Sequence, residues 1–429
     1  MRYVLTSQVL SVTQVEQEAQ KVGATEINVI PRFGQVYCSL QPNQVSRLPK
    51  AIKVRDVGVV RSSQQIVVEE PLTIQLASAP PAEALNMYNV FEQLRQSFQP
   101  PLTGQGLTVA VLDSGVRKTH ETLENAVIYE ANFSSSSTPS DVFGHGIGIA
   151  FLIAGLFSLY SGVAPGARIM NIKVLEDNGE GTEEALVLGI DHVCGLVAGA
   201  KARGLLPSDE DYPNTLNLSI GAPDDGDDNN AVRVACRTAW RDYGLQVIAA
   251  VGNDGPKPST VEMPACDPDV IGVGGIESNN FIVASFSSRG PTREGAIKPD
   301  IVCWSSSILV ASHRGNSEYD MKSGTSFATP VLAGVDGLMW ELGRRVYGQS
   351  WRATWHDVLA YAPYYCVKPQ NAPVDKDNDY GYGLPAINVM VNQVMGAGPA
   401  TGVSTVVEAA APLMMLVVLG TMLKGGLGA

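Results

Sequence analysis

Charged side chains are scarce in this chain of 429 residues, and it has no block rich in Lys or Arg. Only 17% of the residues are charged, and 43 Asp and Glu outnumber 30 Lys and Arg, which gives a formal net charge of −13. A protein that binds nucleic acid needs positive charge against the phosphates. The composition therefore argues against nucleic-acid binding.

Repetitive patterns are also lacking. The 43 Gly and 26 Pro residues follow no period, and 45% of the residues are apolar. This composition excludes a collagen, a coiled coil and a largely disordered protein. A chain of this length can bury a sizeable core, and the length allows two or three domains.

Cysteine is used sparingly and without pattern. The sequence has no CxxC and no Cys/His cluster, so a thiolate metal site is not expected. The cysteines either all pack as buried free thiols or include a disulfide that the sequence cannot pair. They are Cys38, Cys194, Cys236, Cys266, Cys303 and Cys366.

Targeting signals are weak at both ends of the sequence. At the N-terminus, the polar residues 6–8 interrupt the apolar stretch that a secretory signal peptide needs, so we expect no signal peptide. Residues 409–423 are uncharged and mostly apolar but fall short of the roughly 20 residues that cross a bilayer, and extension to Val403 would include Glu408. This tail either docks on a partner protein or is a marginal membrane anchor. We favour docking, and with it a cytoplasmic or assembly-associated location.

Four regions differ along the chain. Residues 1–60 alternate strand and helix signals in the order βαββαβ, which predicts a small ferredoxin-like α+β domain. Residues 61–86 read as a linker, residues 87–395 as the main domain, and residues 396–429 as a flexible linker with the apolar tail. The elements expected in the first region are strands at 2–10, 25–31, 36–40 and 52–60 and helices at 13–22 and 42–48.

The main region alternates apolar runs with helical segments, which predicts an α/β domain with a parallel sheet. Helices are expected over Leu85–Phe98, Glu183–Ala202 and Ser326–Leu342. The expected strands are 107–112, 168–175, 215–220, 245–250, 270–273 and 308–311.

Four polar residues stand at the ends of apolar strands or at the starts of helices. Asp113 ends one strand within Asp-Ser-Gly, and Asn253 follows another. His145 lies between two glycines before an apolar helical segment, and Ser326 begins a helix within Gly-Thr-Ser-Phe-Ala-Thr-Pro.

These residue types combine in nucleophilic catalysis. A serine hydroxyl is a poor nucleophile at neutral pH and needs a base within hydrogen-bond reach, which a carboxylate must orient. Ser326, His145 and Asp113 supply these three groups. Charge that develops on an attacked carbonyl oxygen needs donors, which the Asn253 amide and the Ser326 N–H at a helix N-terminus provide.

The motifs that carry these residues resemble those of the subtilisin-like serine proteases. The order Asp113, His145, Ser326 is the subtilisin order, and residues 324–330 match the family's serine motif completely. Further landmarks stand at 217–221, 285–291, 298–301 and 382–384. The resemblance covers about residues 85–395, and residues 1–60 resemble the family's inhibitory prodomain.

The resemblance implies a three-layer α/β fold and a serine endopeptidase. His145 would act as the base for Ser326, Asp113 would orient His145, and Asn253 would stabilise the oxyanion. The polypeptide substrate would bind as an added strand between two edges, against small and apolar walls that favour an apolar substrate side chain. The residues concerned are Asn217, Ser219, Ile220, Gly221, Ala249, Ala250, Val251 and Gly252 and, at the opposite edge, Gly179 and Gly181.

The resemblance also implies an autoprocessing zymogen, whose prodomain is an intramolecular inhibitor removed by cleavage within Ser62–Asn86. The chemistry requires no cofactor. Structural calcium is left open, because Asp224–Asp228 and Asp375–Asp379 resemble calcium loops in spacing, although solvated acidic loops are the favoured interpretation. One departure is Ile147–Phe151, where the family usually has Thr-His-Val-Ala-Gly; it repacks a helix without removing a catalytic atom.

An alternative function stays open at this point. A catalytically silent protein could keep this fold and its prodomain and dock through the C-terminal tail. Self-cleavage that depends on Ser326 separates the two functions. The remaining histidines are expected at surface or packing positions; they are His120, His192, His313 and His356.

Overall fold

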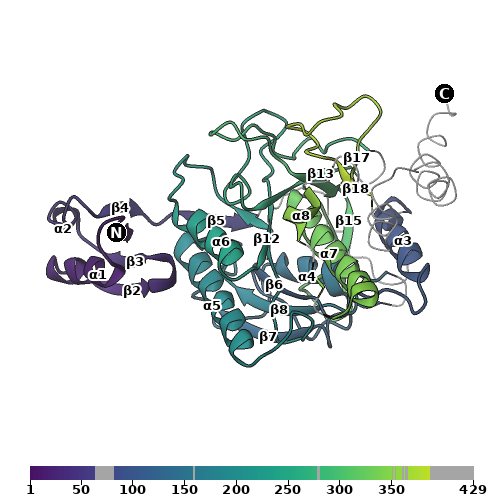
Figure 1. Ribbon diagram of the computed structural model, residues 1–429, viewed down its shortest axis with the longest axis horizontal. Coiled ribbons are helices and arrows are strands. Elements are labelled where there is room, and N and C mark those ends of the chain that lie inside the picture. Colours follow the sequence, from purple (N-terminus) through teal and green to yellow (C-terminus); the bar gives the residue numbers. More distant parts are fainter. Residues whose placement is uncertain are drawn as a thin grey trace.

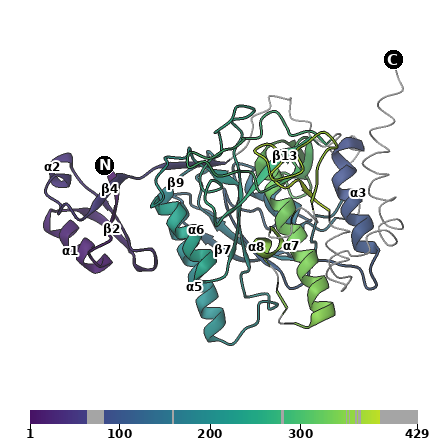
Figure 2. The same cartoon turned by 45° about the horizontal axis from the view of Figure 1, so that its top comes forward.

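The computed structural model describes residues 1–386 except 63–81, 158–159, 278–280, 350, 353, 360–361 and 363–365 (Figure 1). Most of the expected processing window and the whole C-terminal tail lie outside the described residues. In Figures 1 and 2 a small N-terminal unit lies beside α5 (Glu183–Ala202) and α6 (Ala231–Arg241), across the main domain from α3 (Ala82–Gln96).

The N-terminal unit is a four-stranded antiparallel sheet with helices. Its strand order is β2-β3-β1-β4, which is the order of a βαββαβ unit. Ser11 caps the first helix reciprocally with Gln14, and Leu5, Val15 and Val36 lie in a small apolar core. The elements are β1 (Arg2–Thr6), α1 (Val12–Lys21), β2 (Thr25–Ile30), the 3-10 helix η1 (Pro31–Phe33), β3 (Gln35–Ser39), α2 (Pro42–Val45) and β4 (Lys53–Asp56).

The strand expected at 52–60 is divided in the structure. β4 closes the N-terminal sheet, whereas β5 (Val59–Ser62) joins β9 (Glu180–Thr182) and β11 (Ile220–Gly221) of the main domain. The chain passes between them at Gly58, where a Cβ atom would lie 2.7 Å from the Glu183 carboxyl group. A periodicity argument does not detect such a change of partner, because both halves are equally extended.

The main domain is built on a seven-stranded parallel sheet, as the sequence predicted. Its strand order is β14-β13-β12-β10-β6-β8-β7. The strands are β6 (Thr108–Asp113), β7 (Val127–Asn132), β8 (Arg168–Lys173), β10 (Thr215–Leu218), β12 (Gln246–Ala250), β13 (Ile271–Ile276) and β14 (Ile301–Trp304).

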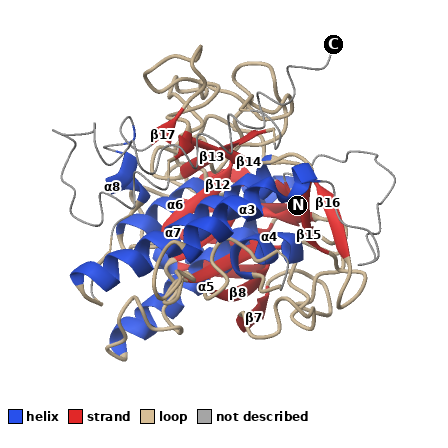
Figure 3. Cartoon of the chain, turned by 90° about the vertical axis from the view of Figure 1, so that its right-hand side faces the viewer, coloured by secondary structure: helices blue, strands red, loops and turns tan. Residues whose placement is uncertain are grey.

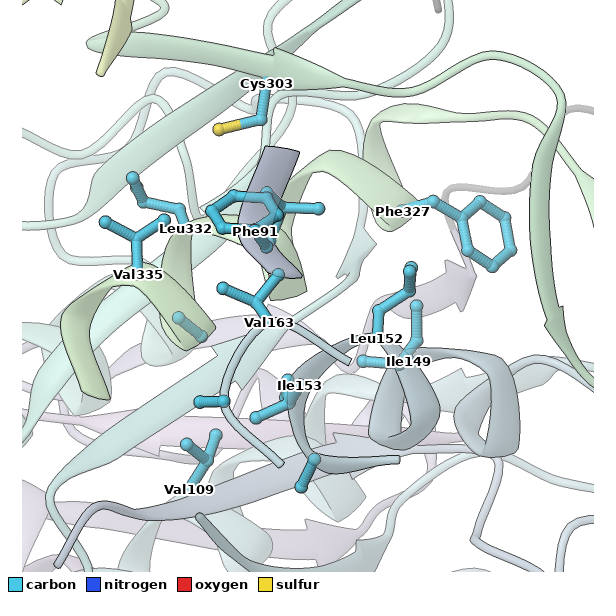
Figure 4. Packing of buried hydrophobic residues seen from close by; sticks show 14 of the residues in the cluster. Phe91, Val109, Ile149, Leu152, Ile153, Val163, Cys303, Phe327, Leu332 and Val335 are labelled. Atoms are coloured by element: carbon cyan, nitrogen blue, oxygen red, sulfur yellow. The ribbon is translucent and has the colours of Figure 1, made fainter. Parts of the chain in front are cut away.

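Helices cover both faces of this sheet, which confirms the three-layer arrangement. Val109 and Val111 of β6 pack with α4 (Gly146–Ala154) and α7 (Thr325–Tyr347), whereas Ala110 and Leu112 pack with α5 and α6. Figure 3 shows the strands together with these helices, and Figure 4 shows Phe91 of α3, Ile153 of α4 and Val335 of α7 as parts of one apolar core. The last helix is α8 (Trp355–Leu359).

One expected strand lies outside the parallel sheet, and the sequence missed two strands of that sheet. Ile308–Ala311 forms β15 of an antiparallel hairpin with β16 (Tyr319–Lys322), and β14 occupies the sheet edge instead. A short apolar run does not reveal whether its partner is parallel or antiparallel. The sequence also missed β7, a partly exposed edge strand with a mixed pattern. A further short pair is β17 (Cys366–Val367) with β18 (Leu384–Pro385).

All six cysteines are free thiols, so no disulfide joins them. Five are buried and Cys366 is half-buried. Within the described part of the chain, α5 is long and apolar enough to cross a membrane, but half of its apolar window is buried in the domain, where it packs against α6 and β6.

One buried carboxyl group in α7 makes stability depend on pH. Asp336 accepts hydrogen bonds from Thr215 Oγ1, at 3.2 Å, and from Gln246 Nε2. Burial raises its pKa from 3.8 to about 7. Between these values the folded state holds a proton that the unfolded state has lost, so folding becomes less favourable as pH rises through this range.

We therefore expect Asp336→Asn to stabilise the protein at pH 8, where the wild-type carboxylate is charged and buried. The gain is on the order of a few kcal/mol at pH 8 and smaller at pH 5. Calorimetric melting at both pH values measures it as a rise in Tm. An equal change in Tm at the two pH values would contradict this assignment.

Candidate active site

Asp113 stands at the carboxyl end of β6, where ligands meet the edge of a parallel sheet. Its side chain is 1% exposed, and its Oδ1 accepts a hydrogen bond from the Ser114 backbone N–H at 2.7 Å. The same oxygen lies 2.7 Å from His145 Nδ1. Asp113 therefore fixes the orientation of the imidazole ring.

His145 immediately precedes α4 and is fully buried. Its neighbours must be glycines: a Cβ atom at Gly146 would lie 2.2 Å from the Gly115 carbonyl oxygen, and Gly144 has φ +91°. The ring meets the Phe327 ring edge-on, with centroids 5.4 Å apart, which brings it to the first turn of α7. His145 Nε2 has no hydrogen-bond partner among the described residues.

Asp141 holds the loop that carries His145, and the sequence analysis missed it. Its carboxylate accepts hydrogen bonds from the backbone N–H groups of Gly144, at 2.7 Å, and Ile147, at 2.9 Å. It also accepts one from Ser114 Oγ at 2.9 Å. Burial raises the pKa of Asp141, although these backbone donors oppose the shift. An aspartate placed four residues before the histidine was the available signal.

Ser326 lies in the first turn of α7, two residues after Gly324, whose φ of +144° favours glycine. Its side chain is fully buried, and its hydroxyl donates to the Ser219 carbonyl oxygen at 2.9 Å. The Ser219 hydroxyl in turn donates to the Ser326 carbonyl oxygen at 2.7 Å. These bonds tie the start of α7 to the end of β10.

Asn253 follows β12 and contacts the residue before Ser326. Its Oδ1 accepts hydrogen bonds from Thr325 N, at 2.9 Å, and from Thr325 Oγ1, at 3.1 Å. Because the oxygen is engaged there, the NH₂ group is directed away from Thr325. Asn253 thus lies beside the Ser326 backbone with a fixed orientation.

The expected peptide-binding edges are occupied by a strand of this same chain. β5 pairs antiparallel with β9, so that Val60 lies opposite Gly181, and with β11, so that Arg61 lies opposite Gly221. Ser62 pairs with Ile220, and its N–H donates to the Gly179 carbonyl oxygen at 3.2 Å.

The other expected wall residues line the ends of neighbouring strands. Asn217 Nδ2 donates to Ser219 Oγ at 2.9 Å, and both side chains are fully buried. Ala249 and Ala250 belong to β12, and Val251 and Gly252 follow it. Two of these wall residues contact the start of α7: Ser219 bonds to Ser326, and the Gly252 carbonyl oxygen accepts a hydrogen bond from Thr325 Oγ1 at 3.1 Å.

Glu262, which is not among the expected wall residues, lies against both walls. A Cβ atom at Gly221 would be 2.1 Å from Glu262 Oε2, and one at Gly252 would be 2.7 Å from Glu262 Cδ. No sequence motif marks Glu262. Its position depends on how the segment that follows Asn253 folds back onto β11.

The acidic stretches form ion pairs and turns rather than exposed loops alone. Asp228 pairs with the buried Arg233 at 2.8 Å, and Asp379 pairs with Arg289 at 2.9 Å. Across the described ranges, no three His, Cys, Asp or Glu side chains come together as a metal site would require.

The other histidines take part in packing. His120 is buried, with Nε2 3.0 Å from the Glu318 carbonyl oxygen, and burial lowers its pKa. His192 stacks on Tyr129, and His356 stacks on Trp240 with centroids 4.0 Å apart. His313 lies against Gly144, beside the His145 loop.

The main domain is similar to a known protein family. The family model described as "Subtilase family" matches residues 104–383. The chain is 34% identical to serine protease AprX of Bacillus subtilis over 269 residues, which are 56% of this chain and 58% of that protein. It is 33% identical to subtilisin DY of Bacillus licheniformis over 241 residues, which are 55% of this chain and 77% of that protein.

A third relative is the human membrane-bound transcription factor site-1 protease, 33% identical over 248 residues, which are 56% of this chain and 21% of that protein. The matches thus span less than two thirds of AprX and of the site-1 protease. The family match covers most of the main domain, and the similarity to subtilisin DY covers most of that relative. The chain belongs to the subtilase family.

Proposed function

We propose that this protein is a serine endopeptidase that is made as a zymogen and processes itself. The observation that carries the proposal is the hydrogen bond of 2.7 Å between Asp113 and His145, whose ring packs against Phe327, the residue after Ser326 in the first turn of α7. Buried carboxylate, imidazole and hydroxyl groups in this order serve acyl transfer. The substrate class is a polypeptide.

In the proposed reaction, Ser326 Oγ attacks the carbonyl carbon of a peptide bond while His145 Nε2 takes the hydroxyl proton. Asp113 keeps the other ring nitrogen protonated and stabilises the imidazolium. The tetrahedral intermediate collapses, the C–N bond breaks, and His145 gives its proton to the departing amine. A water molecule then attacks the acyl-enzyme in the same way, with His145 as the base, and releases the carboxylic acid product and free Ser326.

Negative charge on the carbonyl oxygen is stabilised from two sides. The Asn253 NH₂ group supplies one donor, and the Ser326 N–H at the N-terminus of α7 supplies the other, in the favourable field of the helix dipole. The Thr325 contacts with Asn253 Oδ1 fix the amide before the charge develops. The chemistry uses only side-chain and backbone groups.

The N-terminal unit is proposed to be the inhibitory prodomain. It binds the first turn of α5: Arg2 Nε donates to Glu184 at 2.7 Å, Asn28 donates to the same carboxylate at 2.7 Å, and Arg55 pairs with Glu183. A buried contact joins Gln35 Nε2 to the Ala231 carbonyl oxygen at 3.0 Å. These contacts hold β5 in the peptide-binding edges.

The strand register predicts which bond is cut during maturation. Ser62 lies opposite Ile220, and the neighbouring Ser219 accepts a hydrogen bond from Ser326 Oγ on its carbonyl oxygen. We expect a substrate strand in this antiparallel register to reach Ser326 one residue after Ser62. The proposed scissile bond is therefore Ser63–Gln64, inside the window expected from the sequence.

We expect the purified wild-type chain to convert with time into fragments 1–63 and 64–429, whereas Ser326→Ala stays intact. Intact-mass spectrometry over time measures both. Cleavage of the variant at the wild-type rate would contradict the proposed nucleophile. A new N-terminus outside 62–86 would contradict the proposed role of β5.

A further inference from the structure

The segment Val261–Met263 runs between the two walls of the proposed substrate pocket. Glu262 N donates to the Val251 carbonyl oxygen at 2.9 Å, next to Gly252. Met263 exchanges two backbone hydrogen bonds with Ala222, at 2.8 and 3.0 Å, next to Gly221. Glu262 is therefore held by both walls, and its backbone position is fixed.

Two glycines make room for the Glu262 side chain. A Cβ atom at Gly221 would lie 2.1 Å from Glu262 Oε2, and a Cβ atom at Gly252 would lie 2.7 Å from Cγ and Cδ. Any larger residue at either position would displace the carboxylate. The glutamate is half-buried, so its charge lies inside the space between the walls rather than on the open surface.

This space adjoins the proposed nucleophile. Gly221 is two residues beyond Ser219, whose carbonyl oxygen contacts Ser326 Oγ. On the other wall, the Gly252 carbonyl oxygen accepts from Thr325 Oγ1 at 3.1 Å. In the proposed function, a peptide that binds in the place of β5 passes Gly221, and the gap between these two walls would receive the side chain preceding the cleaved bond.

We propose that Glu262 makes this pocket selective for Arg or Lys as the residue that precedes the cleaved bond; the proposal rests on the proposed function. A half-buried carboxylate attracts a cationic side chain more strongly than an exposed one, because water screens the pair less. Charge-assisted hydrogen bonds to guanidinium or ammonium add to the attraction. An acidic substrate residue is repelled.

The test uses mature enzyme whose active sites are titrated with a fluorophosphonate. Peptides that differ only at the residue before the cleaved bond, with Arg, Lys, Leu or Glu there, are compared by kcat/KM. Because residue 63 is a serine, maturation is not expected to depend on the charge of Glu262, so Glu262→Gln can be prepared in the same way. Glu124→Gln removes an exposed charge and serves as the matched control.

We expect the wild type to cleave the Arg and Lys peptides at least about 10-fold more efficiently than the Leu peptide. Glu262→Gln should lower kcat/KM for Arg and Lys by about 10- to 100-fold and leave the Leu value within about threefold. Glu124→Gln should keep the wild-type preference.

Wild-type preference for Leu, or an equal loss for all peptides in Glu262→Gln, would overturn the proposal while leaving the endopeptidase function intact. If the wild type neither reacts with the fluorophosphonate nor cleaves any peptide, the proposed function fails as well. If Glu262→Gln does not fold, inhibition of the wild-type enzyme by benzamidine, which would compete with the peptide for the pocket, is measured instead. Inhibition by this free amidinium supports the cation pocket, and its absence at millimolar concentration contradicts it.

Discussion

Replacing His145 with alanine is expected to slow the chemical step by about 10⁶-fold, the magnitude of a triad knockout in a subtilisin. Without the imidazole no group takes the Ser326 proton, and the attacking oxygen stays a neutral hydroxyl. The first-order rate constant for self-cleavage of the full-length chain measures the effect. Conversion of the variant should fall below detection.

The control for this variant is His192→Gln. His192 stacks on Tyr129 and has no role in the proposed chemistry. Its replacement should therefore leave the self-cleavage rate within about twofold of the wild-type value. Thermal melting shows whether each variant is folded. The general base is expected to accelerate self-cleavage by far more than about 100-fold. A folded His145→Ala variant that cleaves itself at more than about a hundredth of the wild-type rate would therefore contradict the assignment.

Asp113→Asn should slow the same step by about 10⁴-fold. Asp113 Oδ1 serves two donors, the Ser114 backbone N–H and His145 Nδ1. An asparagine of the same shape loses the negative charge that stabilises the imidazolium. If its NH₂ group faces Nδ1, the ring must also carry its proton on Nε2, where it cannot accept the Ser326 proton.

The effect is measured as the self-cleavage rate constant of Asp113→Asn relative to the wild type. Glu124→Gln, which also loses one carboxylate, is the control. A folded Asp113→Asn variant that matures at a rate close to the wild type would show that the ring is oriented by other groups. In that case Asp141 and the glycines around His145 would carry the orientation.

Much of the fold could be predicted because its signals are local. The helix at Glu183–Ala202 was predicted with its observed bounds, and the parallel sheet followed from buried apolar runs. The errors arose where partners decide the structure. The run at Ile308–Ala311 pairs with the following strand, and the extended segment at Val59–Ser62 pairs with the main domain rather than with the N-terminal sheet.

The residues of the candidate site also fall into those marked by local motifs and those whose positions depend on three-dimensional packing. Asp113, His145, Asn253 and Ser326 stand in short motifs, and the structure brings them to one edge of the sheet. Glu262 has no such motif, because its importance comes from two distant glycines that leave space for it. The contacts between Asp141 and the His145 loop likewise depend on three-dimensional packing.

The proposed function depends most on Ser326 acting as an activated nucleophile. The direct measurement is reaction of the matured wild type and of folded Ser326→Ala with a fluorophosphonate, followed by peptide mapping of the modified residue. We expect one phosphonyl group on the wild type, attached to Ser326, and none on the variant. An unmodified wild type, or equal modification of both proteins at another residue, would contradict it.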